Sequence, residues 1–464
     1  QLEQLRLQED QARRREAEVR GLEMELAGTR CSDAMFFFRR VAASKDHLTA
    51  VTELALYLEA WKEPRTRPLL ERQRELLDLA DCNSPLRRKD LQAGGDATEE
   101  VRSQELEKVA AELAELDFSV DSFWSELELL AQRHERDAAE SGQPRDEAFD
   151  KAKACWQSLL GGGHPFQVLH SRPLQMAGRF LREVLEAIGV SHQDPRGIYV
   201  VSVLGAQSSA KSTLLNFLFG CGFAVRAGRC TRGLYASYFR PAAGGPPMLV
   251  LDSEGLLSLG SEGGVFDGQI ALMCMTCSHL VLVNNKGELS RQLQDLLEIC
   301  LFAMRHLRLA RLQPRLVFVL RDQHDRSRTV HEDMLKKMRS HLEDVARTLG
   351  TPLHDLILLD GTAVSLLPSA VTSELRQGQE VCWTSELFAR EVLQLRSEVF
   401  RWLREDADSR AGAGPPEFSS LAHWYDYAST VWETLDQFGE QLLHYKTIHE
   451  IELRRGLAEV AKTA

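Results

Sequence analysis

The stretch YVVSVLGAQSSAKST at 199–213 constrains the fold more than any other part of the chain. Its first six residues form an apolar run with three β-branched valines, broken only by Ser202, and such a run is typical of a strand buried on both faces of a parallel sheet. Gly205 then precedes Ala210-Lys211-Ser212 by four intervening residues, and a helical pattern, TLLNFLFG, follows. Backbone amides, a lysine ammonium and a hydroxyl at this spacing predict a loop that binds a nucleoside triphosphate with Mg²⁺.

One position of this phosphate-binding loop departs from the motif, which asks for glycine where the chain has Ala210. Glycine leaves room beside the phosphate oxygens and permits unusual backbone dihedral angles. We expect the extra methyl group to cost one charge-assisted hydrogen bond, which lowers nucleotide affinity by about one to two decades. Because Lys211, Ser212, Thr231 and Asp252 persist, the sequence predicts an impaired or slow site without settling whether it is active.

From about residue 198 the pattern alternates between strands and helices, which predicts an α/β fold with a mostly parallel sheet. The expected strands are 199–204, 234–240, 248–251, 280–284, 316–320 and 356–359, and the main helices between them are 211–219, 289–307 and 330–349. A polar run at 134–147 is expected to be a loop, and the chain is expected to be helical again after 380.

These patterns divide the chain into three expected regions. Residues 1–160 read as a helical bundle or coiled region, 161–375 as the P-loop domain, and 376–464 as a C-terminal helical region. Within the first region, 1–30 carries a sparse apolar stripe that permits a coiled coil, although an exposed bundle helix fits it better.

Three residues downstream of the loop complete a nucleotide site in the expected order. Thr231, in RCTRG at 229–233, can give its hydroxyl to Mg²⁺ and so sense the γ-phosphate. Asp252 ends an apolar strand and can hold Mg²⁺ through water, while the amide of Gly255 can meet the γ-phosphate. Each could alone be a surface turn, but four elements in this order favour a functional set.

Base recognition is assigned to Arg321-Asp322, which ends the strand RLVFVL. A carboxylate at Asp322 can accept hydrogen bonds from the N1–H and N2 amine of guanine, which adenine cannot offer. Asn285-Lys286 imitates a guanine motif but comes one strand too early, so we interpret it as a decoy. A helix cap or a salt bridge with Arg321 is the alternative reading of Asp322.

A family resemblance is carried by the stretch VSVLGAQSSAKSTLLNFLFGCGFAVRAGRCTRG. It resembles the G domain of the family of very large interferon-inducible GTPases and the up-regulator of cell proliferation, most specifically over 223–233. The segments 164–188 and 427–438 are similar too, and Arg321-Asp322 resembles the base motif of dynamin-superfamily GTPases. The resemblance implies a P-loop GTPase fold, GTP and GDP as ligands with Mg²⁺, slow hydrolysis, homodimers through the G domain, and a cytoplasmic, sometimes nuclear, location. It also implies that Gln207 and Ser208 help stabilise the transition state.

The predicted site therefore has three overlapping sets of residues. The catalytic set is Gln207, Ser208, Lys211 and Thr231; the nucleotide contacts are Gly205, Ser209, Ala210, Lys211, Ser212, Thr213, Gly255, Arg321 and Asp322; the Mg²⁺ ligands are Ser212, Thr231 and Asp252. Two alternatives stay open: a pseudo-GTPase scaffold that binds nucleotide weakly or not at all and uses its helical regions for protein partners, and an ATPase, which Asp322 disfavours.

Composition excludes several other classes. A formal net charge of −12 argues against general affinity for nucleic acid, and no stretch approaches the roughly 20 apolar residues of a membrane span. Nine scattered cysteines suggest a reducing compartment, and the single C-x-x-C pair, Cys274 and Cys277, is read as buried free thiols in preference to a zinc or redox site. Because the first residue is Gln1, we expect a piece of a longer protein.

Overall fold

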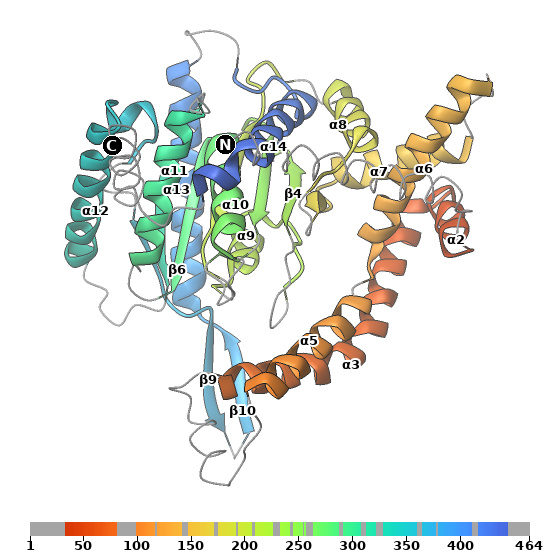
Figure 1. Cartoon of the computed structure of the whole chain (residues 1–464), viewed down its shortest axis with the longest axis horizontal. Helices are drawn as coiled ribbons and strands as arrows, with labels where there is room; N and C mark the ends of the chain where they lie inside the picture. The colour runs from red at the N-terminus through yellow and green to blue at the C-terminus, as the bar shows by residue number, and fades with distance from the viewer. Residues whose placement is uncertain are drawn as a thin grey trace, which may run out of the picture. The chain divides into compact units, whose positions relative to one another are not determined.

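A computed structural model gives the fold as two compact units, Gln1–Trp156 and Gln157–Ala464, and each is considered by itself (Figure 1). The structure describes residues 33–80, 99–116, 118–141, 147–170, 175–191, 194–206, 209–225, 233–241, 245–253, 255–256, 263–286, 291–307, 312–321, 328–359, 364–376, 379–410 and 416–443. The predicted coiled segment 1–30 lies outside these residues.

The first unit consists of helices joined by short turns in its described residues. Its helices are α2 (Asp33–Ala42), α3 (His47–Ala80), α5 (Glu99–Glu115), α6 (Val120–Ser141) and the greater part of α7 (Glu147–Gly161). An aromatic cluster forms its core: Phe38 stacks on Phe123 at 4.6 Å between ring centroids, and Trp124 stacks on Trp156 at 4.9 Å. The loop expected at 134–147 is wrong for its first half, because α6 continues to Ser141.

The second unit is built on one eight-stranded sheet with the order β2-β1-β4-β5-β3-β6-β7-β8. The strands are β1 (Phe166–His170), β2 (Gln175–Met176), β3 (Tyr199–Leu204), β4 (Leu234–Phe239), β5 (Met248–Ser253), β6 (Leu280–Lys286), β7 (Arg315–Arg321) and β8 (Val364–Leu367). The five strands from β5 to β8 in this order are parallel, whereas β4, β1 and β2 extend the sheet in antiparallel pairs. The sheet is therefore mixed, with the parallel part at its centre.

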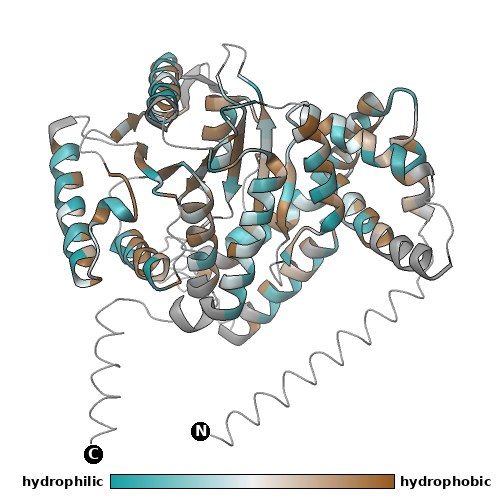
Figure 2. Ribbon diagram, turned by 90° about the horizontal axis from the view of Figure 1, so that it is seen from above, coloured by the Kyte–Doolittle hydropathy of each residue, from teal (hydrophilic) through white to brown (hydrophobic). Residues whose placement is uncertain are grey.

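Helices cover both faces of this sheet and give the layered α/β fold that the alternation predicts (Figure 1). They are α8 (Arg179–Ser191), α9 (Lys211–Phe219), α10 (Gly263–Cys277), α11 (Arg291–His306), α12 (Arg328–Thr348), the short η1 (Leu353–Asp355), α13 (Glu386–Arg410) and α14 (Leu421–Leu443). A core cluster joins α9 and α13 to one face of β3, β5, β6 and β7. Helix α14 packs against α8, α10 and α11. Helices in Figure 2 show both hydrophobic and hydrophilic residues, as amphipathic surface helices should.

Strand β3 sits at the centre because all six of its side chains are buried. It pairs in parallel with β5 on one side and β6 on the other, with Val203 opposite Asp252 and Leu204 opposite Val283. The carboxyl ends of these strands therefore meet at one edge of the sheet, which is where ligands bind in open α/β sheets. This register places the loop after β3 between the ends of β5 and β6.

The structure corrects two expected elements in the second unit. Residues 356–359 do not form a strand: the chain makes a single bridge between Leu358 and Arg315, and the edge strand is β8. The chain after 380 is not helical at once, because β9 (Val371–Arg376) and β10 (Gln379–Thr384) form a separate antiparallel hairpin before α13 begins. None of the described helices is both long and apolar enough to span a membrane.

Candidate functional site

The turn between β3 and α9 has a left-handed backbone at Ala210. Its dihedral angles are φ 58° and ψ 44°, and among the described residues it is the only non-glycine with positive φ. A left-handed residue followed at once by helical Lys211 gives the local geometry of an anion-binding nest of backbone N–H groups. The sequence argument that this position needs unusual dihedral angles is confirmed, and the alanine carries a strain of roughly 1–2 kcal/mol.

Gly205 lies where the loop leaves β3 and passes very close to β6. A Cβ atom built on Gly205 would lie 2.1 Å from the carbonyl oxygen of Asn284 and 3.1 Å from Ser209 Oγ. Its own carbonyl accepts a hydrogen bond from Leu256 N–H at 3.0 Å. Gly205 therefore permits the close backbone approach that fixes the start of the loop.

Lys211 begins α9 and is folded back over the loop. Its Nζ donates to the carbonyl oxygens of Gly205 at 3.0 Å and Ala206 at 3.1 Å, and the residue is 6% exposed. A nearly buried ammonium is expensive unless it is compensated by acceptors or an anion. The arrangement places a positive charge beside the backbone of the loop.

Ser212 and Asp252 bring two oxygen ligands together from different elements. Ser212 Oγ donates to Asp252 Oδ2 at 2.6 Å, and Asp252, at the end of β5, is buried. A hydroxyl paired with a buried carboxylate is the oxygen donor set that Mg²⁺ prefers at a phosphate site. The described residues thus fit the metal role predicted for both.

Two residues brace the loop from the sheet in ways that the sequence reading missed. Asn284, one residue before the decoy pair, donates its Nδ2 to the carbonyl oxygen of Ser209 at 2.6 Å. Arg321 donates its Nη1 to the carbonyl oxygens of Ser209 at 3.1 Å and Ala210 at 3.3 Å. A buried asparagine inside an apolar strand was the available signal for Asn284, since buried polar groups seek partners.

The remaining predicted residues fall into two groups. Thr213 lies in the first turn of α9, and Gly255 precedes Leu256, which pairs with Ala206 in a bridge beside the loop. Four other predicted site residues lie outside the described residues: Gln207, Ser208, Thr231 and Asp322. The structure therefore brings Gly205, Ser209, Ala210, Lys211, Ser212, Asp252 and Arg321 together around one turn, and the binding and catalytic roles of all the predicted site residues stay predictions.

The pair Asn285-Lys286 closes β6, whose neighbours are β3 and β7. Lys286 lies opposite Arg321 in the parallel register. Strand β7, which carries Arg321, is thus one position further from β3 than β6, which carries Asn285-Lys286. This topology agrees with the strand order on which the assignment of the base to Arg321-Asp322 rested.

The C-x-x-C cysteines are buried thiols without a metal-type neighbourhood. Cys274 and Cys277 are free, and their side chains lie inside the fold around α10. Burial raises the pKa of Cys277 to about 12 and the pKa of Cys274 still further. No cluster of three or more His, Cys, Asp or Glu suited to a metal occurs in the described part of the chain. The reading of this pair as free thiols is confirmed.

Burial of these thiols predicts both slow labelling and an alkaline loss of stability. Their pKa values are higher in the folded than in the unfolded chain, so the neutral thiol stabilises the fold below about pH 8.5 and this contribution falls as pH rises toward 12. At pH 8 we expect iodoacetamide to label Cys274, Cys277 and Cys300 only after denaturation. Mass-spectrometric mapping of native and unfolded samples measures this, and rapid native labelling would contradict it.

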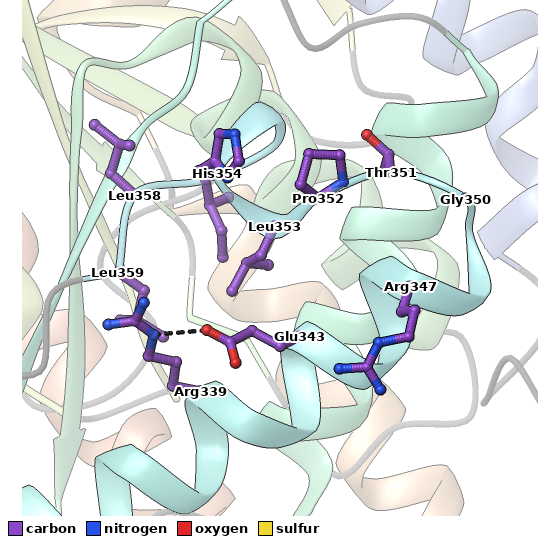
Figure 3. A pocket seen from close by; sticks show the side chains of 11 residues that line it. Arg339, Glu343, Arg347, Gly350, Thr351, Pro352, Leu353, His354, Leu358 and Leu359 are labelled. Carbon is purple, nitrogen blue, oxygen red and sulfur yellow. Dashed lines mark hydrogen bonds and ion pairs between the residues drawn. The ribbon is translucent and has the colours of Figure 1, made fainter.

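A separate pocket of about 640 Å³ lies between the second half of α12 and the segment that follows it (Figure 3). Its walls include Arg339 and Glu343, joined by an ion pair at 2.8 Å, and the apolar side chains of Leu353 and Leu359. None of the predicted site residues lines it. The nucleotide hypothesis therefore does not depend on this pocket.

Comparison with known proteins gives a consistent family result. A family model described as "URGCP-like GTPase domain" matches residues 76–351, more than half of the chain. The chain is 33% identical over 192 residues to interferon-induced very large GTPase 1 of Mus musculus, covering 39% of this chain and 8% of that protein. It is 29% identical over 177 residues to the up-regulator of cell proliferation of Mus musculus, covering 36% of this chain and 19% of that protein. The chain thus spans less than a fifth of either relative.

A solved structure also aligns with part of this chain. The crystal structure of Toc33 from Arabidopsis thaliana, a dimerization-deficient mutant, covers 43% of this chain and 83% of its own, with 13% identity. Its TM-score is 0.28, so the alignment carries no argument about fold or function. The fold assignment rests on the sheet, the loop and the family match.

Proposed function

The chain belongs to the URGCP-like GTPase domain family, and from this premise we propose that it binds GTP and GDP with Mg²⁺ at the loop 205–213 and hydrolyses GTP slowly. The observation that carries the proposal is the convergence at one turn of a left-handed residue, a nearly buried lysine and a serine–aspartate pair. Each group matches one need of a Mg-bound polyphosphate: amides and ammonium for the phosphates, oxygen ligands for the metal.

Within this proposal the described residues have distinct tasks. The backbone N–H groups around Ala210 face the β-phosphate, and Lys211 neutralises charge on the phosphate chain. Ser212 and Asp252 would hold Mg²⁺, with Thr231 as the further predicted ligand. When bound, the ion would neutralise charge on the phosphate oxygens and orient them.

The proposal also covers base recognition and the γ-phosphate. Asp322, which lies outside the described residues, is proposed to accept hydrogen bonds from the guanine N1–H and N2 amine, and the amide of Gly255 is proposed to meet the γ-phosphate. Gln207 and Ser208 are proposed to stabilise the transition state, by resemblance to dynamin-superfamily GTPases. Support for these roles is their order along the chain and the placement of Arg321 and Asp252 at the carboxyl ends of β7 and β5, which run in the same direction within one sheet.

The proposal extends to assembly and location by family resemblance alone. We propose that the chain forms homodimers through the G domain, that its helical regions contact protein partners, and that it acts in the cytoplasm and also in the nucleus. Light scattering with GDP and a transition-state mimic tests the first point. A monomer in every nucleotide state would overturn it.

The strained geometry at Ala210 favours a second candidate, a pseudo-GTPase scaffold. A left-handed alanine holds its conformation only while surrounding contacts compensate its strain, so the turn can lose its anion-binding shape more easily than a glycine loop. Such a protein would bind nucleotide weakly or not at all and act through its helical regions. Restored binding in an Ala210→Gly variant of a non-binding wild type would establish this candidate.

Titration with fluorescent GTP, GDP and ATP, with and without Mg²⁺, tests the proposed function directly. We expect GTP and GDP to bind in the low micromolar range or weaker, because Ala210 removes about one to two decades of affinity. ATP should bind at least about tenfold more weakly than GTP, since adenine lacks the donors that a carboxylate accepts. Equal affinity for ATP and GTP would indicate an ATPase, and no binding to wild type or Ala210→Gly would overturn nucleotide handling.

A further inference from the structure

Arg321 is attached to the phosphate-binding loop by its guanidinium group. The residue ends β7, is 7% exposed, and donates Nη1 to the carbonyl oxygens of Ser209 at 3.1 Å and Ala210 at 3.3 Å. The same guanidinium lies over the ring of Phe388 on α13, with its central carbon 5.8 Å from the ring centroid. The side chain is therefore held between the core and the strained turn.

A second side chain from the sheet contacts the same part of the loop as Arg321. Asn284 Nδ2 donates to the carbonyl oxygen of Ser209 at 2.6 Å. In a trans peptide the C=O and N–H bonds point in opposite directions. Holding the Ser209 carbonyl toward β6 and β7 therefore turns the Ala210 amide toward the opposite side of the loop.

From this geometry we infer that Arg321 is a positioning residue for the phosphate-binding amides, acting through the carbonyls of Ser209 and Ala210. The inference rests on the proposed function for its ligand, a guanosine polyphosphate, but the bracing itself is a property of the protein alone. Arg321 stabilises the left-handed conformation of Ala210, which is unfavourable for an alanine without such contacts. Strand β7 thereby contributes to the phosphate site as well as to the predicted base site that follows it.

Arginine suits this task better than lysine because the face of its planar guanidinium lies over the Phe388 ring while Nη1 donates to the two carbonyl oxygens. A lysine at this position would keep the charge but lose the planar group that lies over the ring. We therefore expect Arg321→Lys to keep part of the GDP affinity that Arg321→Gln loses.

The first test is a double-mutant cycle in GDP binding, using Arg321→Gln, Ala210→Gly and the double variant. Arg321→Gln alone should weaken GDP binding by about 10- to 100-fold, as expected for lost charge-assisted hydrogen bonds. In the Ala210→Gly background the same change should have an effect at least about fivefold smaller, because glycine adopts the left-handed turn without bracing. Additive effects would overturn the inference.

A second measurement separates positioning from base recognition. If Arg321 acts only through the loop, Arg321→Gln should weaken GDP and IDP by the same factor, since IDP lacks only the N2 amine. A changed ratio would assign Arg321 to the base and overturn the inference. The matched control is Arg315→Gln at the other end of β7, where the arginine pairs with Asp406 at 3.1 Å; it should leave GDP affinity unchanged.

Amide hydrogen exchange without nucleotide keeps the inference testable if the proposed function fails. Arg321→Gln should accelerate exchange in the first turn of α9 by at least about tenfold, whereas Arg315→Gln should not, because local opening tracks the lost contacts. If wild type bound no GDP and Arg321→Gln still showed this acceleration, the proposed function would be overturned and the bracing supported. Unchanged exchange in Arg321→Gln would overturn the bracing whatever the nucleotide result.

Discussion

Lys211→Met is expected to abolish GTP turnover and nearly all stabilisation by GDP while the sheet stays folded. In the described contacts, the Lys211 ammonium is the one positive charge that α9 contributes to the loop. Methionine removes this charge but keeps an unbranched aliphatic side chain. Loss of a charged phosphate contact in a nearly buried site should weaken GDP binding by about 100-fold or more. At a GDP concentration of 100 times the wild-type dissociation constant, the ligand should stabilise wild type by about 2.7 kcal/mol but the variant by only about 0.4 kcal/mol.

Thermal unfolding with and without GDP and Mg²⁺ measures this difference, and phosphate release measures turnover. Lys336→Met on α12 is the matched control, since Lys336 is exposed and pairs only locally with Asp333 at 2.9 Å in the described contacts. It should behave like wild type in both assays. Undiminished hydrolysis in Lys211→Met would remove the assigned site altogether.

The elements next to the loop could be predicted residue by residue because their signals are local. The bounds of β3 and α9 coincide with the predicted 199–204 and 211–219. In β3 every side chain is apolar or small and buried, so no alternating pattern competes with the strand. Helix α9 ends where Gly220 adopts a left-handed cap, which the sequence marks with the glycine itself.

Elements defined by distant partners could not be read in the same way. The apolar run at 356–359 resembles a strand, but the register of β7 selects Val364–Leu367 as its neighbour instead. Strand β1 has only five residues, and its antiparallel partner β4 lies more than sixty residues away in sequence, so no nearby turn signals the pairing. Strands β9 and β10 pair with each other, whereas the expected C-terminal helical region began at 376.

The same division holds inside the site. The residue types of the loop predicted phosphate chemistry because amides, lysine and serine act from one short segment. The bracing by Asn284 and Arg321 could not be predicted, because each reaches the loop from a different strand across the sheet edge. The sequence flagged Ala210 for its missing glycine, whereas the structure shows what compensates it.

Gly205→Ala is expected to produce the largest combined loss of stability and binding. The new Cβ would lie 2.1 Å from the Asn284 carbonyl oxygen, a distance that backbone atoms cannot tolerate, so the loop must move away from β6. That movement also breaks the 3.0 Å hydrogen bond from Leu256 and displaces an acceptor of Lys211. Overpacking against backbone should lower the free energy of unfolding by about 3 kcal/mol, and GDP binding should fall by more than about 100-fold.

Gly220→Ala is the control that separates the steric clash at Gly205 from the cost of placing an alanine at a positive φ angle. Gly220 also has positive φ, at the other end of α9, but a Cβ built there meets nothing within 4 Å. It should therefore lose only the roughly 1–2 kcal/mol of a left-handed alanine and keep its affinity for GDP. Urea unfolding and GDP titration of both variants give the comparison. If Gly205→Ala proved no worse than Gly220→Ala in either measurement, contact between the loop backbone and β6 would not be what shapes the phosphate site.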